Sequence, residues 1–310
     1  MLLLWVLFNL FVVGILVADL RVFRRRGQII GFREALRSTA LYVAMAAAFA
    51  AGLYFWQGRQ NSLEFITAYV LELSLSVDNL FLFLVIFRYF AVPDEQQHRV
   101  LFWGIVGALI LRGTFIVAGV SLIQRFHWLF LIFGALLIYS GIRLGITGQP
   151  KVDPAANPLV KALRRFVPVT TEYQGSRFFI RKPEEKNSRQ SLRLYATPLV
   201  VVLIVIETTD VLFAVDSIPA VLSITLNAFI VYAANVFAIL GLRSMYFAVS
   251  GLMRIFRFLR YGLALVLVLT GAKMMGADHI HIPIAATLGA VASLLLISIA
   301  LSLAFPNKIE

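Results

Sequence analysis

Repeated stretches of about twenty apolar residues constrain this chain more than any other feature of its sequence, because a helix needs about 20 such residues to cross the hydrocarbon core of a bilayer. Lipid offers the backbone no hydrogen-bond partners, so each crossing must be a complete helix or part of a closed barrel. Nine ranges meet the length requirement: 2–20, 36–56, 63–88, 99–121, 127–143, 197–222, 226–250, 258–276 and 282–305. Hydrophobic residues make up 60% of the chain, against roughly half in soluble domains. The sequence therefore predicts an all-α, polytopic membrane helical bundle with about nine transmembrane helices.

Basic residues are distributed unevenly between the two sides that these helices would leave. Of the 28 Lys and Arg residues, 23 fall on one side if nine spans alternate, in the segments 21–37, 88–99, 143–193 and 254–260 and at Lys308. The opposite side holds only Arg59 and Arg125. By the positive-inside rule, we expect the N-terminus outside and the C-terminus in the cytoplasm. The net charge of +12 is then a signal of topology, and we expect the lipid bilayer, and no nucleic acid, as a partner.

The pattern divides the chain into five parts. These are 1–60 with two N-terminal transmembrane helices, 61–145 with transmembrane repeat 1, 146–196 as a cytoplasmic basic loop, 197–277 with transmembrane repeat 2, and 278–310 with the C-terminal transmembrane helix and a short tail. In the loop, "SRFFIRKPEEKNSRQSLRLYATP" predicts a short hairpin and no active site. The chain contains no cysteine, which excludes disulfides and thiolate metal ligands.

The inference of two repeats depends on three pairs of similar segments that occur in the same order in both copies. "ELSLSVDNLFLFLV" resembles "ETTDVLFAVDSIPAV", Arg112 in "GALILRG" corresponds to Arg243 in "FAILGLRS", and "YSGIRL" (139–144) matches "LTGAKM" (269–274). The acids can be aligned in two ways. One pairs Asp78 with Asp210. The other uses the shared six-residue spacing and matches Glu72 and Asp78 with Asp210 and Asp216. Because the copies are three spans apart, we expect an inverted three-helix repeat, an architecture typical of secondary transporters with a binding site near the midplane.

Five carboxylates lie inside the two repeated spans, where a charge without a partner costs several kcal/mol. They are Glu72, Asp78, Glu207, Asp210 and Asp216. With the oxygens of Asn79 and Ser217 they form a set of hard ligands that suits Mg²⁺, Ca²⁺ or Mn²⁺. The set therefore predicts a metal site that handles a substrate ion, and no cofactor.

Helical geometry places Glu207 and Asp210 on one face, with Asp216 roughly opposite Glu207. Pro219 cannot donate to residue 215, so we expect a helix break near Asp216. A matching break after Asp78 would let Asp78, Asn79, Asp216 and Ser217 converge.

The alternative is that the acids only neutralise buried bases. The candidate charge partners are Arg112, Arg243 and Lys273. Five acids exceed three bases by two, which favours a functional site for the group as a whole. Either arginine alone could be an ion-pair strut or a contact for the substrate.

The sequence resembles the TerC family of integral membrane proteins, including its Alx-type members. The resemblance rests on "LELSLSVDNLFLF" (71–83), on "TPLVVVLIVIETTDVLFAVDSIPAV" (197–221) and on "FFIRK" before it. It implies a nine-span bacterial inner (plasma) membrane protein associated with manganese export and, by name, with tellurium resistance. The metal-site role carries onto Glu72, Asp78, Asn79, Glu207, Asp210, Asp216 and Ser217. Tellurite itself is less well motivated, because an acid-rich core without cysteine should repel an oxyanion.

These observations predict a secondary transporter and not an enzyme, since the chain has no P-loop and no catalytic triad or HExxH pattern. We expect it to export divalent cations, most of all Mn²⁺, in exchange for protons. The alternative is a non-transporting membrane partner that assists assembly or metal loading of exported proteins, with tellurite resistance as an indirect phenotype.

Overall fold

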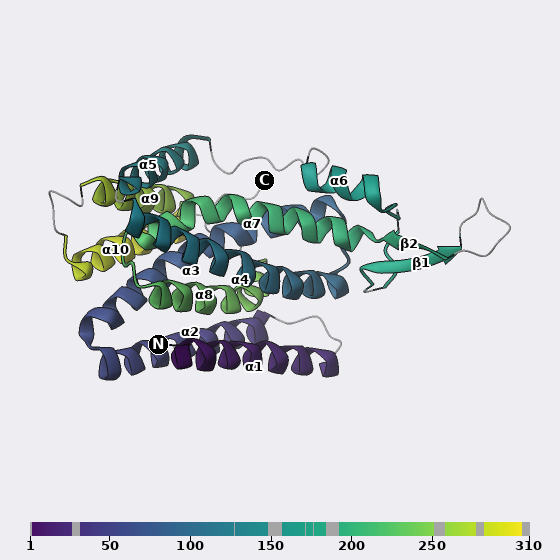
Figure 1. Cartoon of the computed structure of the whole chain (residues 1–310), viewed down its shortest axis with the longest axis horizontal. Helices are drawn as coiled ribbons and strands as arrows, with labels where there is room; N and C mark the ends of the chain where they lie inside the picture. Colours follow the sequence, from purple (N-terminus) through teal and green to yellow (C-terminus); the bar gives the residue numbers. More distant parts are fainter. Residues whose placement is uncertain are drawn as a thin grey trace.

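The structure, a computed structural model of the chain, describes residues 2–26, 32–126, 128–147, 157–170, 172–175, 177–183, 192–250, 258–276 and 282–305 (Figure 1). Within these ranges the chain forms nine long helices: α1 (Leu2–Arg26), α2 (Phe32–Gln57), α3 (Arg59–Tyr89), α4 (Asp94–Arg125), α5 (Leu129–Thr147), α7 (Pro198–Leu222), α8 (Ala228–Ser250), α9 (Leu259–Met275) and α10 (Ile284–Ala304). A short helix, α6 (Pro158–Phe166), and two strands, β1 (Phe179–Pro183) and β2 (Leu192–Ala196), lie between α5 and α7.

Each of the nine apolar ranges coincides with one of the long helices, because the same apolar content that suits a bilayer also forms continuous helix. Among the described residues, five helices are long and apolar enough to cross a membrane: α2, α4, α5, α7 and α10. The chain is therefore a helical membrane protein with several spans. The crossing by all nine helices stays a prediction.

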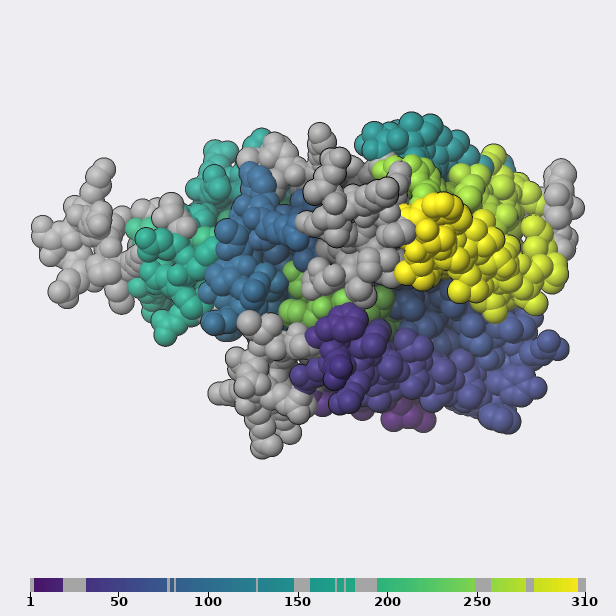
Figure 2. All heavy atoms as spheres, turned by 180° about the vertical axis from the view of Figure 1, so that it is seen from behind, coloured from purple at the N-terminus to yellow at the C-terminus, as the bar shows by residue number. Residues whose placement is uncertain are grey.

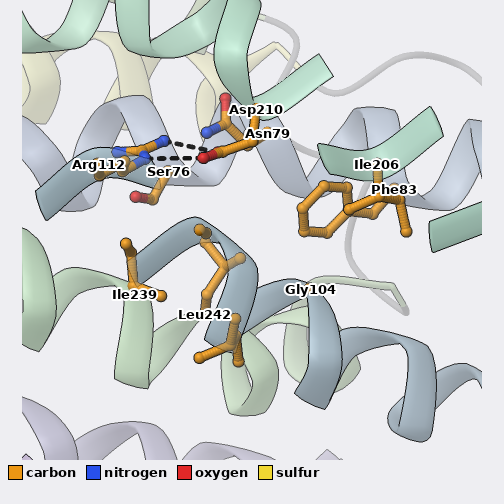
Figure 3. A pocket seen from close by; sticks show the side chains of 11 residues that line it. Ser76, Asn79, Phe83, Gly104, Arg112, Ile206, Asp210, Ile239 and Leu242 are labelled. Atoms are coloured by element: carbon orange, nitrogen blue, oxygen red, sulfur yellow. Dashed lines mark hydrogen bonds and ion pairs between the residues drawn. The ribbon is translucent and has the colours of Figure 1, made fainter. Parts of the chain in front are cut away.

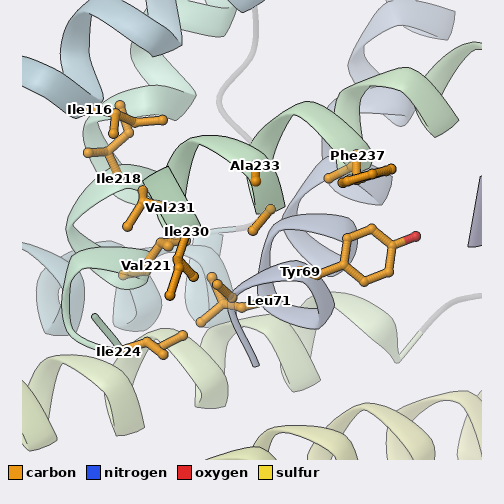
Figure 4. Packing of buried hydrophobic residues seen from close by; sticks show 14 of the residues in the cluster. Tyr69, Leu71, Ile116, Ile218, Val221, Ile224, Ile230, Val231, Ala233 and Phe237 are labelled. Atoms are coloured by element: carbon orange, nitrogen blue, oxygen red, sulfur yellow. The ribbon is translucent and has the colours of Figure 1, made fainter. Parts of the chain in front are cut away.

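The long helices run side by side in one bundle (Figure 1). In its middle α3 packs on α8 and α4 packs on α7, while α2 flanks α8 on one side and α5 packs on α9 on the other. Close-packed apolar side chains fill the space between α3, α4, α7 and α8, among them Leu71, Ile116, Val221 and Phe237 (Figure 4). The central four helices thus form the core in which the sequence places its acids.

The outer faces of the bundle are apolar. On α1, Leu3 and Leu10 are 70% and 61% exposed, and on α10 Leu296 is 66% exposed. Figure 2 shows that α2 and α10 are both at the surface on one face of the bundle. Such large apolar faces are unfavourable in water and are solvated by acyl chains in a bilayer. The surface therefore agrees with the membrane assignment.

The basic loop folds into a small lobe at one end of the bundle (Figure 1). Its strands pair antiparallel, with Phe179 opposite Ala196, which confirms the predicted hairpin. The Tyr173 hydroxyl donates to the carbonyl of Phe90 over 2.6 Å, and the guanidinium of Arg99 lies 5.6 Å from the ring centre of Phe178. Burial raises the pKa of Tyr173 to about 12, so its hydroxyl keeps the proton that it donates. The lobe is thus fixed to the α3–α4 connection.

The predicted break near Asp216 is wrong. α7 is continuous from Pro198 to Leu222, with Pro219 inside it, and α3 is continuous across Asp78 and Asn79. Pro219 stands in the last turn of α7, so the hydrogen bond that it cannot make lies where the helix is about to end, and few later residues depend on it. The acids therefore project from regular helices, and their directions follow helical periodicity.

Helices α5 and α9 approach each other until their backbones nearly touch. A Cβ atom added to Gly271 would lie 2.6 Å from the carbonyl oxygen of Gly134, and one added to Gly134 would lie 2.9 Å from the carbonyl oxygen of Gly271. A Cβ atom on Gly141 would lie 2.7 Å from the carbonyl oxygen of Ala264. Only glycine at these positions permits so short a distance between helices, as in other membrane helix pairs with small residues at the contact.

We expect Gly271→Leu to destabilise the protein by about 1–3 kcal/mol or more, because a side chain there must push apart two backbones. Thermal melting of the purified protein in detergent measures the effect. The matched control is Gly52→Leu in α2, where a Cβ atom meets nothing within 4 Å. Equal melting temperatures for the two variants would contradict the close contact.

Candidate functional site

Arg112 of α4 is the centre of the buried charge. Its Nε and Nη2 atoms donate to both carboxylate oxygens of Asp210 on α7, over 3.0 and 2.8 Å, and its Nη1 atom donates to Oε2 of Glu72 on α3 over 3.0 Å. Figure 3 shows the fork between Arg112 and Asp210. The side chains of Arg112 and Glu72 are 2% and 0% exposed. One guanidinium therefore joins three helices and two carboxylates away from water.

Asn235 of α8 lies close to the Glu72 carboxylate, but its Nδ2 atom makes no hydrogen bond of acceptable geometry to a described residue. Within the described part of the chain, Oε1 of Glu72 is buried and has no hydrogen-bond partner. An unpaired carboxylate oxygen in this position is a strong acceptor that no described residue satisfies. Glu72 therefore keeps one oxygen available to a ligand.

Glu207 lies one turn before Asp210 on the same face of α7, as helical spacing predicts. Its carboxylate occupies the space that a side chain at Gly107 of α4 would fill, since a Cβ atom there would overlap all the carboxylate atoms. Among the residues that the structure describes, its Oε2 atom is covered and unpartnered, and no ion pair is made to it. Glu207 is thus a half-buried acid, and none of the described residues supplies it with a base.

Asp216 points to a different neighbour. Its Oδ1 atom accepts a hydrogen bond of 2.7 Å from Ser140 of α5, on the side of α7 away from Arg112. Ser217 shares the face of Asp210 two turns further along, and its buried Oγ atom finds no partner among the described residues. The seven predicted ligands therefore do not form a single cluster.

Two predicted side chains, those of Asp78 and Arg243, lie outside the described residues, although their helices are described. Lys273 of α9 lies within electrostatic range of Glu64 of α3; the ion pairs of Glu72 and Asp210 are made with Arg112 instead. Of the three bases, the structure thus joins Arg112 to the acids.

A small cavity of about 10 Å³ lies beside this cluster. Asp210, Arg112, Asn79 and Ser76 form its polar wall (Figure 3). Its size suits about one water molecule or a bare ion. A larger cavity of about 620 Å³ lies on the outer side of α1, α4 and α8, and no acid lines it. Of these two cavities, the small one lies beside the carboxylates.

The described side chains do not yet form a coordination shell. No group of three or more His, Cys, Asp or Glu residues among them stands close enough to hold a metal ion. Arg112 occupies both oxygens of Asp210 and one of Glu72, which leaves the unpartnered oxygens of Glu72 and Glu207 as free acceptors. A cation bound here would need rearrangement around Arg112 or further ligands.

Three residues of the site were not anticipated from the sequence: Gly107, Ser140 and Asn235. Ser140 lies in "YSGIRL", one of the repeated segments, so its position next to a repeat glycine was a usable signal. Gly107 and Asn235 matter because of side chains on other helices, and nothing in their own neighbourhood in the sequence indicates it.

Comparison with known proteins gives one family. The family described as "Integral membrane protein TerC family" matches residues 57–309. An uncharacterized membrane protein of Myxococcus xanthus is 43% identical over 300 residues, 97% of this chain and 92% of its own. Proteins named "Putative membrane-bound redox modulator Alx" are 41% identical in Salmonella typhi (97% of this chain, 94% of that one) and 40% identical in Escherichia coli K12 (96% and 92%). No solved structure matches the chain significantly.

We expect Gly107→Ala to lower stability by about 1–3 kcal/mol, because the new methyl group displaces the Glu207 carboxylate from its place. The loss should largely disappear in a Glu207→Ala background, giving a coupling of about 1 kcal/mol or more in a double-mutant cycle measured by thermal melting. Gly104→Ala is the control on the same helix, since its Cβ atom meets Ile206 at an ordinary 3.4 Å. Additive effects of the two substitutions would contradict the contact.

Proposed function

Since the chain belongs to the TerC family of integral membrane proteins, we propose that it is a secondary transporter that exports divalent metal cations, Mn²⁺ foremost, in exchange for protons. The cation would pass through the carboxylate site at the interface of two inverted repeats. In this proposal Glu72, Glu207 and Asp210 contact the cation, with Asp78 and Asn79 from the facing helix. Asp216 and Ser217, up to about 10 Å further along α7 at 1.5 Å per residue, belong to another part of the same path.

One observation supports the proposal above all: among the described residues, the acids of this cluster outnumber the base that neutralises them. Arg112 pairs with Glu72 and Asp210, while Glu207 stays without a base among the described residues. A purely structural network would be expected to balance its charge, because unpaired charge at this depth is costly. Oxygen acceptors of this kind suit Mn²⁺, Mg²⁺ or Ca²⁺.

The contact between α5 and α9 supports the inverted repeat. Matching residues 139–144 with 269–274 aligns Gly141 with Gly271 and, by the same offset, Gly134 with Ala264. The contact of Gly141 with the Ala264 carbonyl then corresponds to the contact of Gly271 with the Gly134 carbonyl. Two equivalent contacts are what a pseudo-two-fold axis between α5 and α9 requires.

The second candidate function is a non-transporting membrane partner that helps to assemble exported proteins or to load them with metal. The small lobe at the end of the bundle would suit such a role, and the acids would then be structural. The name of the Alx relatives refers to redox modulation. The chain has no cysteine and so no thiol–disulfide couple of its own, and we do not propose a redox reaction for it.

The proposal includes nine spans in a bacterial inner membrane, with the N-terminus outside. The lobe supports this orientation, because its contacts bring the basic segment 143–193 to the same end of the bundle as the 88–99 connection. Both segments carry the basic excess that the positive-inside rule assigns to the cytoplasm.

A measurement of Mn²⁺ transport distinguishes the two candidate functions. Everted vesicles that contain the purified protein should accumulate Mn²⁺ when a pH gradient is applied, and empty vesicles should not. Glu207→Gln should abolish accumulation and any Mn²⁺-induced rise in melting temperature, since a ligand stabilises only the state that binds it. The fold should persist, because the substitution breaks no ion pair.

Glu64→Gln is the matched control, as Glu64 is an acid of α3 whose carboxylate accepts an exposed hydrogen bond from Gln60. It should behave like the unaltered protein. Absence of Mn²⁺ accumulation by the unaltered protein would favour the partner function, and full activity of Glu207→Gln would remove this acid from the site.

Topology can be tested with reporter fusions. Fusions at Arg26, Pro154 and the C-terminus should report the cytoplasm, and one at Asn227 should report the outside. An external signal at Pro154 would reverse the proposed orientation.

A further inference from the structure

We propose that the short helix α6 is an interfacial helix that binds the headgroups of anionic phospholipids at the edge of the bilayer. Its basic side chains contact the lipid phosphates, and the apolar side chains that the protein leaves uncovered enter the outer part of the acyl layer. The inference goes beyond the proposed function, because it assigns a lipid site to the lobe and does not depend on the transported ion.

Local sequence determines where α6 begins. The side-chain oxygen of Asn157 accepts hydrogen bonds from the backbone nitrogens of Leu159 and Val160 over 2.9 and 3.3 Å, and Pro158 takes the first helical position. A helix of nine residues is marginal by itself in water, so packing on α7 stabilises it. Val160 is 2% exposed and belongs to the same apolar cluster as Leu199 of α7. α6 therefore presents a defined surface.

The protein covers only part of the apolar face of α6. Leu159 and Phe166 are seven residues apart and share one side of the helix, and they are 54% and 80% exposed. Val160, which makes the buried contact, lies about 100° away from Leu159 around the helix axis. Exposure of a leucine and a phenylalanine side by side is unfavourable in water and favourable in contact with acyl chains. This side of α6 thus needs an apolar environment that the described residues do not supply.

The other side of α6 is basic. Lys161, Arg164 and Arg165 follow at helical spacing, all three are exposed, and α6 contains no acid. Among the described residues, none of the three forms an ion pair. Their long side chains can reach phosphate groups while the helix stays packed on the protein. A helix with basic and apolar sides is complementary to an anionic membrane surface.

The place of α6 along the bundle matches the depth of the headgroups. Helices α4 and α7 pass each other near Gly104, where an added Cβ atom would lie 3.4 Å from Ile206. The preceding residue in α4, Trp103, is 47% exposed, and tryptophan is enriched where acyl chains meet headgroups. α6 packs on the first half of α7, on the outside of the bundle (Figure 1). It therefore lies close to the edge of the hydrocarbon layer.

These three observations favour lipid over a soluble protein as the occupant. Any occupant has to meet an apolar side and a basic side of one short helix, on the outer surface of a membrane protein. A bilayer that contains anionic lipid presents acyl chains and phosphates together at this depth. No further component is needed.

The test uses the absence of cysteine from the chain, which allows a label at one chosen position. The full chain with Phe166→Cys carries an environment-sensitive fluorophore and is placed in nanodiscs of phosphatidylcholine, with or without phosphatidylglycerol. With phosphatidylglycerol the emission should shift to the blue, and quenching by an aqueous quencher should fall by about tenfold or more, because several basic residues act together. The same label at Arg181→Cys, on the hairpin that extends away from the bundle (Figure 1), should be quenched equally in both lipids.

The contribution of charge is measured in the labelled Phe166→Cys chain. Lys161→Gln/Arg164→Gln/Arg165→Gln changes only exposed side chains, so the protein should fold, and the protection that depends on phosphatidylglycerol should be lost. Arg177→Gln/Arg181→Gln is the control, since it removes two exposed basic residues of the lobe outside α6, and it should leave the protection unchanged.

The inference is overturned if the label at position 166 is quenched equally in both lipids, or if its protection survives the triple substitution. Protection that appears only when a soluble cytoplasmic protein fraction is added would assign this face to a protein partner and would equally overturn the lipid site. The measurement requires no Mn²⁺. Its failure would therefore leave the proposed transport function standing, and a failure of transport would leave the lipid site standing.

Discussion

The fork of Arg112 on Asp210, with Glu72 on its third nitrogen, is the interaction on which the centre of this protein depends. It is buried inside the bundle and joins α3 and α4 to α7, helices that belong to different halves of the chain. Removing one partner of such a pair typically costs about 3–5 kcal/mol, because the other charge stays buried. The same interaction uses three of the six carboxylate oxygens of Glu72, Glu207 and Asp210, the acids of the proposed cation site. Stability of the bundle and availability of the site are therefore coupled through one side chain.

Continuity of α7 determines how the remaining polar groups are arranged. A straight helix sends residues three, four and seven apart to the same side, so Glu207, Asp210 and Ser217 face the α4 side while Asp216 meets Ser140 of α5. Two polar regions result on one helix, instead of one convergent cluster at a break. An ion that visited both would have to move around α7 as well as along it, which gives Ser140 and the α5–α9 pair a place beside the path.

Helix positions could be predicted from this sequence because one property, a long apolar run, determines both burial in lipid and helix formation. All nine ranges coincide with helices, and the hairpin followed from the turn-rich segment between Ile180 and Leu194. The position of Glu207 and Asp210 on the same face of α7 followed from helical periodicity. The break at Pro219 was wrong because its effect depends on its distance from the helix end, which depends on how α7 terminates at Leu222. Contacts such as Gly107 with Glu207 could not be predicted, since they depend on which helices become neighbours.

The contact between α5 and α9 has a consequence for how movement in this protein can be observed. Where Gly134 meets Gly271, carbonyl groups lie where side chains would normally separate two helices, so sliding of one helix would carry bulkier neighbours into the opposite backbone. The two helices therefore behave as one mechanical part. Pairs of spectroscopic labels on α5 and α9 should keep a constant separation, and a third label on α4 or α8 could be located against them. The α5–α9 pair thus provides a fixed reference for measuring movement of the other helices, and it does so where glycines leave no side chain between the two backbones.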